Sequence, residues 1–203
     1  MFRISVFVSG RGSNLRALLD SPLIQGTVAV AAVLSDKREC GAFEVADAYG
    51  IPHFTVTRTA EPGTVEESSL TRVLYDLGTE AVVLAGYLKL IPGDLIAAFP
   101  EKIINIHPAL LPFFGGAGMY GIRVHKAVFA SGMKVSGPTV HFVNEEYDQG
   151  AIIAQRAVSI SHCTTPEEIA AEVLKAEHTL LPEVVAALAT GRIKQEDGRY
   201  RIT

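Results

Sequence analysis

The sequence contains little cysteine, no long apolar run and no excess of basic residues. Its two cysteines, Cys40 and Cys163, have no CxxC or CxxH spacing, which excludes a disulfide framework and a typical zinc motif. No segment approaches the roughly 18 apolar residues of a membrane span, and the first apolar stretch is too short for a signal peptide. We therefore expect a cytoplasmic protein that does not enter a membrane.

The charge balance is equally informative. The 203 residues include 18 basic and 22 acidic side chains, for a net charge of −4, without a basic run or a basic-aromatic stripe. Nucleic acid is therefore not an expected partner. A chain of this length buries roughly 70 % of its unfolded surface, so residues 1–203 are expected to form one domain without a crosslink.

Short apolar runs alternate with helix-like segments in the first half of the chain. This order is typical of an α/β fold: a Rossmann-like, open, mostly parallel sheet with helices on both faces. A polar stretch at 59–69 is expected to be a loop leading into a helix. Strands are expected at 4–9, 28–35, 53–56, 81–86 and 102–107, and helices at 14–20, 41–49 and 92–99.

The second half of the sequence predicts that one antiparallel strand joins this sheet. After a helix at 124–131, the runs 137–143 and 151–158 are expected to pair as a hairpin around the turn-rich residues 144–150. Thr165, Pro166 and Glu168 form a capping-box pattern that opens a helix to about Thr190. A small hairpin turning at 197–198 is expected to follow.

The stretch INIHPALLP (104–112) is the strongest candidate for a functional site. Asn105 and His107 are two residues apart at the end of an apolar run, so on a strand their side chains point the same way. Pro108 and Pro112 restrict the loop that follows. The alternative is a strand end with a polar cap and a structural histidine.

Asp148 is the candidate acidic partner of His107. It is an ordinary hairpin aspartate beside Gly150 unless its loop folds over the end of the Asn105 strand. In that case the carboxylate would favour the imidazolium of His107 and raise its pKa, while burial would oppose this. His141, on the strand leading to Asp148, is expected to have a packing or hydrogen-bonding role.

Glycines and small polar residues coincide in SGRGSN (9–14), between the first strand and the first helix. Free N–H groups at such a helix start can bind a phosphate, although neither the dinucleotide fingerprint nor GK[ST] is present. The alternative is a tight glycine turn capped by Ser13 or Asn14. No GxSxG or HExxH pattern occurs, so neither an acyl-enzyme nor a metal is expected.

Three segments, SGRGSN (9–14), INIHPALLP (104–112) and SGPTVHFVNEEYDQGAIIAQ (136–155), in this order along the chain resemble the folate-dependent formyltransferases over essentially the whole chain. The resemblance implies transfer of a formyl group from 10-formyltetrahydrofolate to the amine of glycinamide ribonucleotide in purine biosynthesis. It also implies that Asn105 and protonated His107 stabilise the oxyanion, and that Asp148 keeps His107 charged.

The resemblance further implies two sets of binding residues. The substrate's ribose phosphate and adjoining groups are assigned to Gly12, Ser13, Asn14 and Glu177, and the folate to Leu88, Lys89, Leu90, Ile91, Asn105, Val143, Glu145 and Tyr147. The glycines of the loop FFGGAGMYG (113–121) suggest a mobile element. A monomer or homodimer is expected. The alternatives are a formyltetrahydrofolate hydrolase, a formyltransferase for another amine, or a non-catalytic nucleotide-binding module.

Overall fold

The computed structural model describes all 203 residues, which form two compact units, residues 1–104 and 105–203. The strand order of the main sheet is β4-β3-β2-β1-β5-β6-β8-β9. In the first unit, β1 pairs in parallel with both β2 and β5, and β2, β3 and β4 continue in parallel. These strands are β1 (Phe2–Val8), β2 (Val28–Ser35), β3 (His53–Thr57), β4 (Thr64–Glu66) and β5 (Ala81–Leu84).

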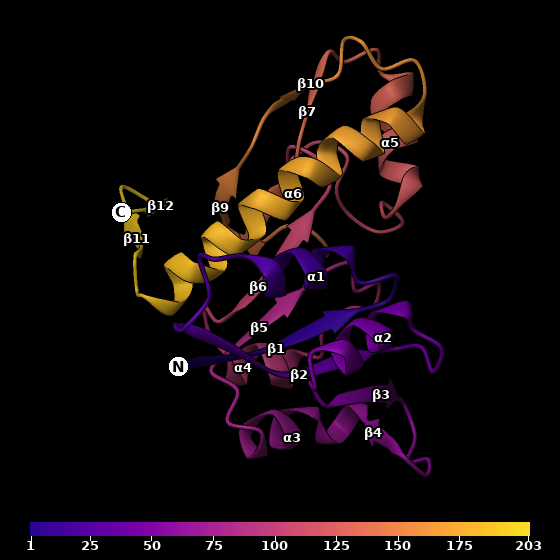
Figure 1. Ribbon diagram of the computed structural model, residues 1–203. Coiled ribbons are helices and arrows are strands. Elements are labelled where there is room, and N and C mark those ends of the chain that lie inside the picture. The colour runs from indigo at the N-terminus through magenta and orange to yellow at the C-terminus, as the bar shows by residue number, and fades with distance from the viewer. The chain divides into compact units, whose positions relative to one another are not determined.

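The helices of the first unit cover both faces of its strands. From β1 the chain steps outward through β2 to β3 and then returns to β5, on the other side of β1. Because crossovers between parallel strands are right-handed, the two directions of travel place their helices on opposite faces. Figure 1 shows α1 and α2 above the strands, and α3 and α4 below them. The helices are α1 (Ser13–Asp20), α2 (Gly41–Ala48), α3 (Leu70–Asp76, after the 3₁₀ turn η1, Glu67–Ser69) and α4 (Gly93–Ala98).

Coverage on both faces explains the apolar character of the central strands. Ile4, Val6 and Phe7 of β1 and Val82 and Val83 of β5 have no exposed surface. A strand buried on one face only would alternate apolar with polar residues, whereas a strand covered on both faces reads as a continuous apolar run. The α/β class predicted from these runs is confirmed.

The second unit contains the antiparallel part of the sheet. β8 pairs with β9 in antiparallel register, as the sequence predicts for a hairpin, with a register shift between Val140 and His141. Two short pairs lie outside this sheet, β7 with β10 and β11 with β12. The elements are β6 (Ile103–His107), α5 (Ile122–Ala130), β7 (Val135–Ser136), β8 (Thr139–Phe142), β9 (Ile152–Gln155), β10 (Val158–Ser159), α6 (Pro166–Ala189), β11 (Ile193–Glu196) and β12 (Arg199–Ile202).

The long helix α6 packs against α5 in this unit (Figure 1). The hydroxyl oxygen of Thr165 accepts a hydrogen bond from the Glu168 N–H, and the Glu168 carboxylate accepts one from the Thr164 N–H at 2.6 Å. The predicted capping box therefore forms, although its carboxylate reaches back one residue further than in the usual arrangement. None of the helices combines the length and the hydropathy that crossing a lipid bilayer requires.

Two sequence predictions of local structure are wrong. Thr64–Glu66, expected in a loop, forms the edge strand β4, held by a 2.8 Å contact between the hydroxyls of Thr57 and Thr64. The run 151–158, expected as one strand, divides into β9 and the start of β10, and β10 pairs with β7, which precedes the run 137–143. At the break, a Cβ on Gly137 would lie 1.8 Å from the Arg156 carbonyl oxygen, so the two backbones approach too closely for a regular ladder.

Candidate active site

Asn105 and His107 lie on β6 and meet Asp148 from the turn after β8. The Nδ1 atom of His107 is 3.4 Å from Oδ2 of Asp148, and Nδ2 of Asn105 is 3.4 Å from Oδ1 of the same carboxylate. The side chains of His107 and Asp148 are only 4 % and 10 % exposed. The turn therefore folds over the strand end, as the functional alternative of the sequence analysis requires.

The backbone of this turn is tightly constrained. Asp148 has φ of 57°, in the left-handed region that aspartate tolerates better than most residues. Two residues later, a Cβ on Gly150 would lie 1.6 Å from the Phe142 carbonyl oxygen. The chain can fold back onto β8 and aim the Asp148 carboxylate at β6 only because residue 150 lacks a side chain.

His141 fixes the orientation of the Asn105 amide. Its Nδ1 donates to the Phe142 carbonyl oxygen at 2.7 Å, because a carbonyl can only accept. Its Nε2 then accepts from Nδ2 of Asn105 at 3.0 Å. One amide hydrogen is held by His141, and the other points along the longer contact to Asp148. This second hydrogen is the donor that a developing oxyanion could use.

The charge state of His107 reflects opposing influences. Burial lowers its pKa below the usual value, while the Asp148 carboxylate and the Phe114 carbonyl, 2.9 Å from Nε2, act to raise it. Burial alone would raise the pKa of Asp148, but the charge of His107 and the hydrogen bond from the Gly116 N–H lower it. The carboxylate is therefore held as an anion beside an imidazole whose protonated form it supports.

His125 is a buried residue of α5 that the sequence analysis did not place in the site. It is 5 % exposed, its Nδ1 has no hydrogen-bond partner, and burial together with the charge of His107 lowers its pKa to about 4. The buried residues of α5 are Val124, His125 and Val128, so the helical spacing of the two valines was the signal that could have placed His125 inward.

The loop 113–121 also contributes main-chain groups to the site, and the residue types in the sequence do not predict them. The Phe114 carbonyl oxygen accepts from Nε2 of His107, and the Gly116 N–H donates to Oδ2 of Asp148 at 2.9 Å. The sequence suggested a mobile loop at this place. In the structure, its backbone contacts both members of the His107–Asp148 pair.

The glycine turn after β1 is built in the first unit. Gly12 is the N-cap of α1, with φ of 77°, and a Cβ there would lie 2.8 Å from Cα of Ala42. The cap is therefore Gly12, and the alternative in which Ser13 or Asn14 caps the helix is wrong because both residues lie within α1. The first N–H groups of α1 have no intrahelical acceptor, and groups of this kind can bind an anion.

The segment 88–91 is tied to this turn. The Ser9 hydroxyl accepts from the Leu88 N–H at 3.1 Å and donates to Oδ1 of Asp36 at 2.5 Å. Lys89 is exposed, as are Leu88 and Leu90 at 37 % and 42 %, while Ile91 is buried. Apolar side chains beside a cation suit an aromatic ring with a carboxylate tail. Since the strand order reverses between β1 and β5, this is the switch point where open α/β sheets bind ligands.

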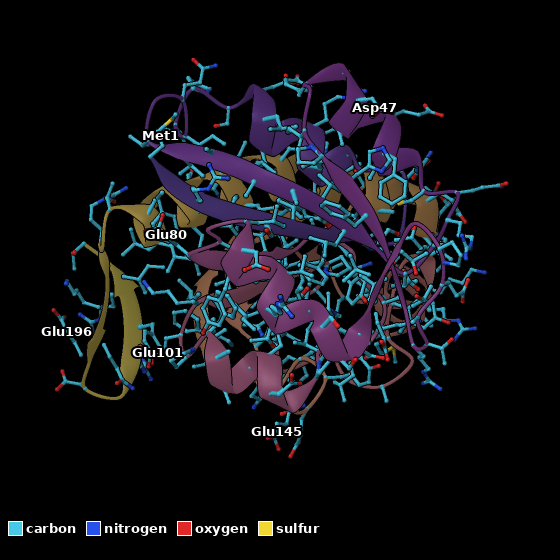
Figure 2. The ribbon with its side chains drawn as sticks, turned by 90° about the horizontal axis from the view of Figure 1, so that it is seen from below. Met1, Asp47, Glu80, Glu101, Glu145 and Glu196 are labelled. Carbon is cyan, nitrogen blue, oxygen red and sulfur yellow. The ribbon has the colours of Figure 1, made fainter.

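The remaining predicted site residues lie in the second unit. Glu177 is buried on α6, at 7 % exposure. Val143, Glu145 and Tyr147 precede Asp148 in the turn, where Tyr147 is 40 % exposed and the Glu145 side chain points outward (Figure 2). No group of three or more His, Cys, Asp or Glu side chains is placed to hold a metal ion.

Comparison with known proteins identifies relatives of this arrangement. Residues 2–185 match the family model described as formyl transferase. The chain is 51 % identical to the chloroplastic phosphoribosylglycinamide formyltransferase of Arabidopsis thaliana and 48 % identical to that of Vigna unguiculata, covering 97 % and 94 % of this chain but 68 % and 62 % of those proteins. The crystal structure of phosphoribosylglycinamide formyltransferase from Anaplasma phagocytophilum superposes with a TM-score of 0.88 at 35 % identity, covering 100 % of this chain and 93 % of the other.

Proposed function

Because the chain belongs to the formyl transferase family, we propose that it transfers the formyl group of 10-formyltetrahydrofolate to the amine of glycinamide ribonucleotide, a step of purine biosynthesis. The observation that carries this proposal is the buried cluster of Asn105, His107 and Asp148 in a chain half identical to a plant enzyme of that name. The chain spans about two thirds of the length of its plant relatives.

The cluster suits direct attack of an amine on a formyl carbon. As the new bond forms, the formyl oxygen gains negative charge, which the imidazolium of His107 and the Asn105 N–H that lies on the longer contact to Asp148 would stabilise. One well-placed donor of this kind contributes about 3 kcal/mol. Asp148 would keep His107 charged and take part in moving the proton that the amine must lose.

The residues that would bind the two substrates are those that the resemblance to the family implies. The first N–H groups of α1, at Ser13 and Asn14, would bind the ribose phosphate, and Glu177 would contact the substrate. Leu88, Leu90 and Ile91 would provide apolar contacts for the pterin ring, and Lys89 would pair with a carboxylate of the folate tail. The turn residues Val143, Glu145 and Tyr147 would close on the ring.

The test is a transfer assay in metal-free buffer. Tetrahydrofolate release from 10-formyltetrahydrofolate is followed with and without glycinamide ribonucleotide, and the formylated product is identified by mass. Release that requires the amine and yields the formylated product supports the proposal. Release without the amine would indicate a hydrolase instead. Absence of release under both conditions would contradict formyl transfer to this acceptor.

A further inference from the structure

The main chain of residues 114–116 contacts both members of the catalytic pair with opposite polarity. A carbonyl oxygen, that of Phe114, faces Nε2 of His107, and an N–H, that of Gly116, faces Oδ2 of Asp148, each at 2.9 Å. One three-residue segment therefore provides a hydrogen-bond acceptor for the His107 ring, the prospective cation, and a hydrogen-bond donor for the Asp148 carboxylate, the anion. Hydrogen bonds to charged groups are shorter and stronger than those between neutral groups.

We propose that the backbone of Phe114–Gly116 is a positioning element of the active site, a clamp that holds the His107 ring and the Asp148 carboxylate in their reactive geometry. This inference rests on the proposed function and adds residues to it that the family resemblance did not assign. The clamp acts on His107 and Asp148 and does not itself touch the reacting atoms.

The clamp fixes which atoms of His107 carry hydrogen. A carbonyl can only accept, so Nε2 of His107 must donate to Phe114, and Nδ1 then faces the Asp148 carboxylate at 3.4 Å. A bare lone pair on Nδ1 would repel that carboxylate, whereas an N–H on Nδ1 is attracted to it. Two acceptors on opposite sides of the ring therefore favour the imidazolium, against its burial.

Three local features hold the clamp in place. Phe114 has φ of 58°, a left-handed conformation that residues other than glycine rarely adopt. Its ring packs against a buried cluster of Val128, Ile160, Ile169 and Val173. A Cβ on Gly115 would lie 2.4 Å from Cδ2 of Leu111 and 3.1 Å from Cβ of Asp148, so the segment reaches the carboxylate only because residue 115 is glycine.

The glycines of this loop provide a matched pair of variants. Gly115→Ala forces the segment away from Asp148 and Leu111. Gly118→Ala adds the same methyl group to the same loop where nothing lies within 4 Å, and its φ of 85° adds a left-handed strain that Gly115→Ala does not have, so it is the more strained of the two variants but lacks the contact. Phe114→Ala is a second disrupting variant, because it removes the ring from its buried cluster while keeping the carbonyl.

The direct readout is the Nε2–H proton of His107 in the ligand-free protein, observed by NMR with ¹⁵N-labelled histidine and assigned by its loss in His107→Asn. A proton donated to a buried carbonyl exchanges slowly with water and is visible. We expect this signal in the wild type and in Gly118→Ala, and its loss in Gly115→Ala and Phe114→Ala.

Kinetics supply the second readout. Loss of one hydrogen bond to the charged ring should lower kcat about tenfold or more in Gly115→Ala and Phe114→Ala, with KM for both substrates changed less than about threefold. Gly118→Ala should stay within about threefold of the wild type in kcat. A KM effect without a kcat effect would contradict a role in positioning His107.

The two readouts separate failure of the clamp from failure of the proposed function. Retention of the Nε2–H signal in Gly115→Ala and Phe114→Ala would overturn the clamp, as would loss of the signal with an unchanged kcat. If the wild type transfers no formyl group, the proposed function fails, and the proton signal still decides whether the segment holds His107.

Discussion

The turn at residues 9–14 and the cluster of His107, Asp148, His141 and His125 both lie near strand ends, but the turn consists of main-chain groups and the cluster of side chains. The turn is made of backbone whose conformation depends on glycine, and the groups proposed to bind an anion there are uncharged N–H dipoles at the start of α1. The cluster is made of buried titratable side chains. The imidazoles of His107 and His141 lie beside the Asp148 carboxylate, and the charge of His107 acts on the third imidazole, that of His125. A dipole site recognises a ligand without changing protonation, whereas a buried charged cluster can exchange protons with a substrate.

This difference predicts a division of kinetic roles. Changes in the turn should alter the binding of substrate and hence KM, and changes in the cluster should alter kcat.

The largest effect is expected from His107→Asn. The variant removes the imidazolium beside the developing oxygen, and kcat should fall by about 10²- to 10⁴-fold with little change in KM. Steady-state kinetics with both substrates varied would measure this. Asp148→Asn should follow in the same direction. An increase in KM with unchanged kcat would show that His107 serves substrate binding. The turn and the cluster would then not differ in their kinetic roles.

The cluster should also give the protein an acid sensitivity that the turn lacks. The pKa of His125 is about 4 in the folded protein and about 6.5 in an unfolded chain. Between these values the unfolded chain binds a proton that the folded protein does not, so stability is present above about pH 6.5 and is lost as the pH falls towards 4. At about 1.4 kcal/mol for each pKa unit, the loss is on the order of 3 kcal/mol.

Denaturant unfolding of the wild type and His125→Phe at pH 7 and pH 4.5 measures this loss. The variant should show a smaller fall in stability between the two pH values, with a remainder from His107, whose pKa is also lowered by burial. Equal pH dependence in both proteins would show that His125 is protonated in the folded state.

Gly12→Ala tests the backbone of the turn. The new methyl group would lie 2.8 Å from Cα of Ala42 at φ of 77°, and the left-handed conformation alone costs about 1–2 kcal/mol. We expect lower stability and a higher KM for the phosphorylated substrate. Gly10→Ala is the control, since nothing lies within 4 Å of its Cβ, and its stability should stay within about 0.5 kcal/mol of the wild type.

Ser9→Ala is expected to have the smallest effect. The variant removes the hydroxyl that joins the Leu88 N–H to Asp36, which should cost about 1 kcal/mol. The measurement is KM for the folate, expected to rise a few fold at unchanged kcat. Ser21→Ala, which loses only a local 3.3 Å contact with the Leu23 N–H, should leave KM unchanged.

The sequence predicted most of the regular structure and the part of the site that has a periodic signal. The parallel strands were recognisable from their apolar runs, and Asn105 and His107 from their spacing of two on β6. The edge strand β4 was missed because Thr64–Glu66 has only partly buried residues and hence no apolar pattern. The division of the hairpin strands at Gly137 depends on the approach of Arg156, which is distant in sequence.

The contacts that shape the cluster were harder to predict. The Phe114 carbonyl and Gly116 N–H are main-chain groups, which every residue except proline possesses, so residue identity carries no signal for them. His141 was expected to hydrogen-bond within the structure, but its partner Asn105 lies on another strand. The extent of the domain and the catalytic roles of Asn105, His107 and Asp148 remain predictions.

The turn between β8 and β9 also limits how this chain can change over generations. Surface loops usually accept insertions and deletions. Here a Cβ on Gly150 would lie 1.6 Å from the Phe142 carbonyl oxygen, so residue 150 must be glycine. The Asp148 carboxylate must also stay in contact with His107. One added residue would displace the carboxylate by up to about 3.5 Å, as much as the contact it makes. Sequence drift in this hairpin should therefore leave its length unchanged and be confined to Asn144 and Glu146, the residues of its exposed tip that have no proposed binding role.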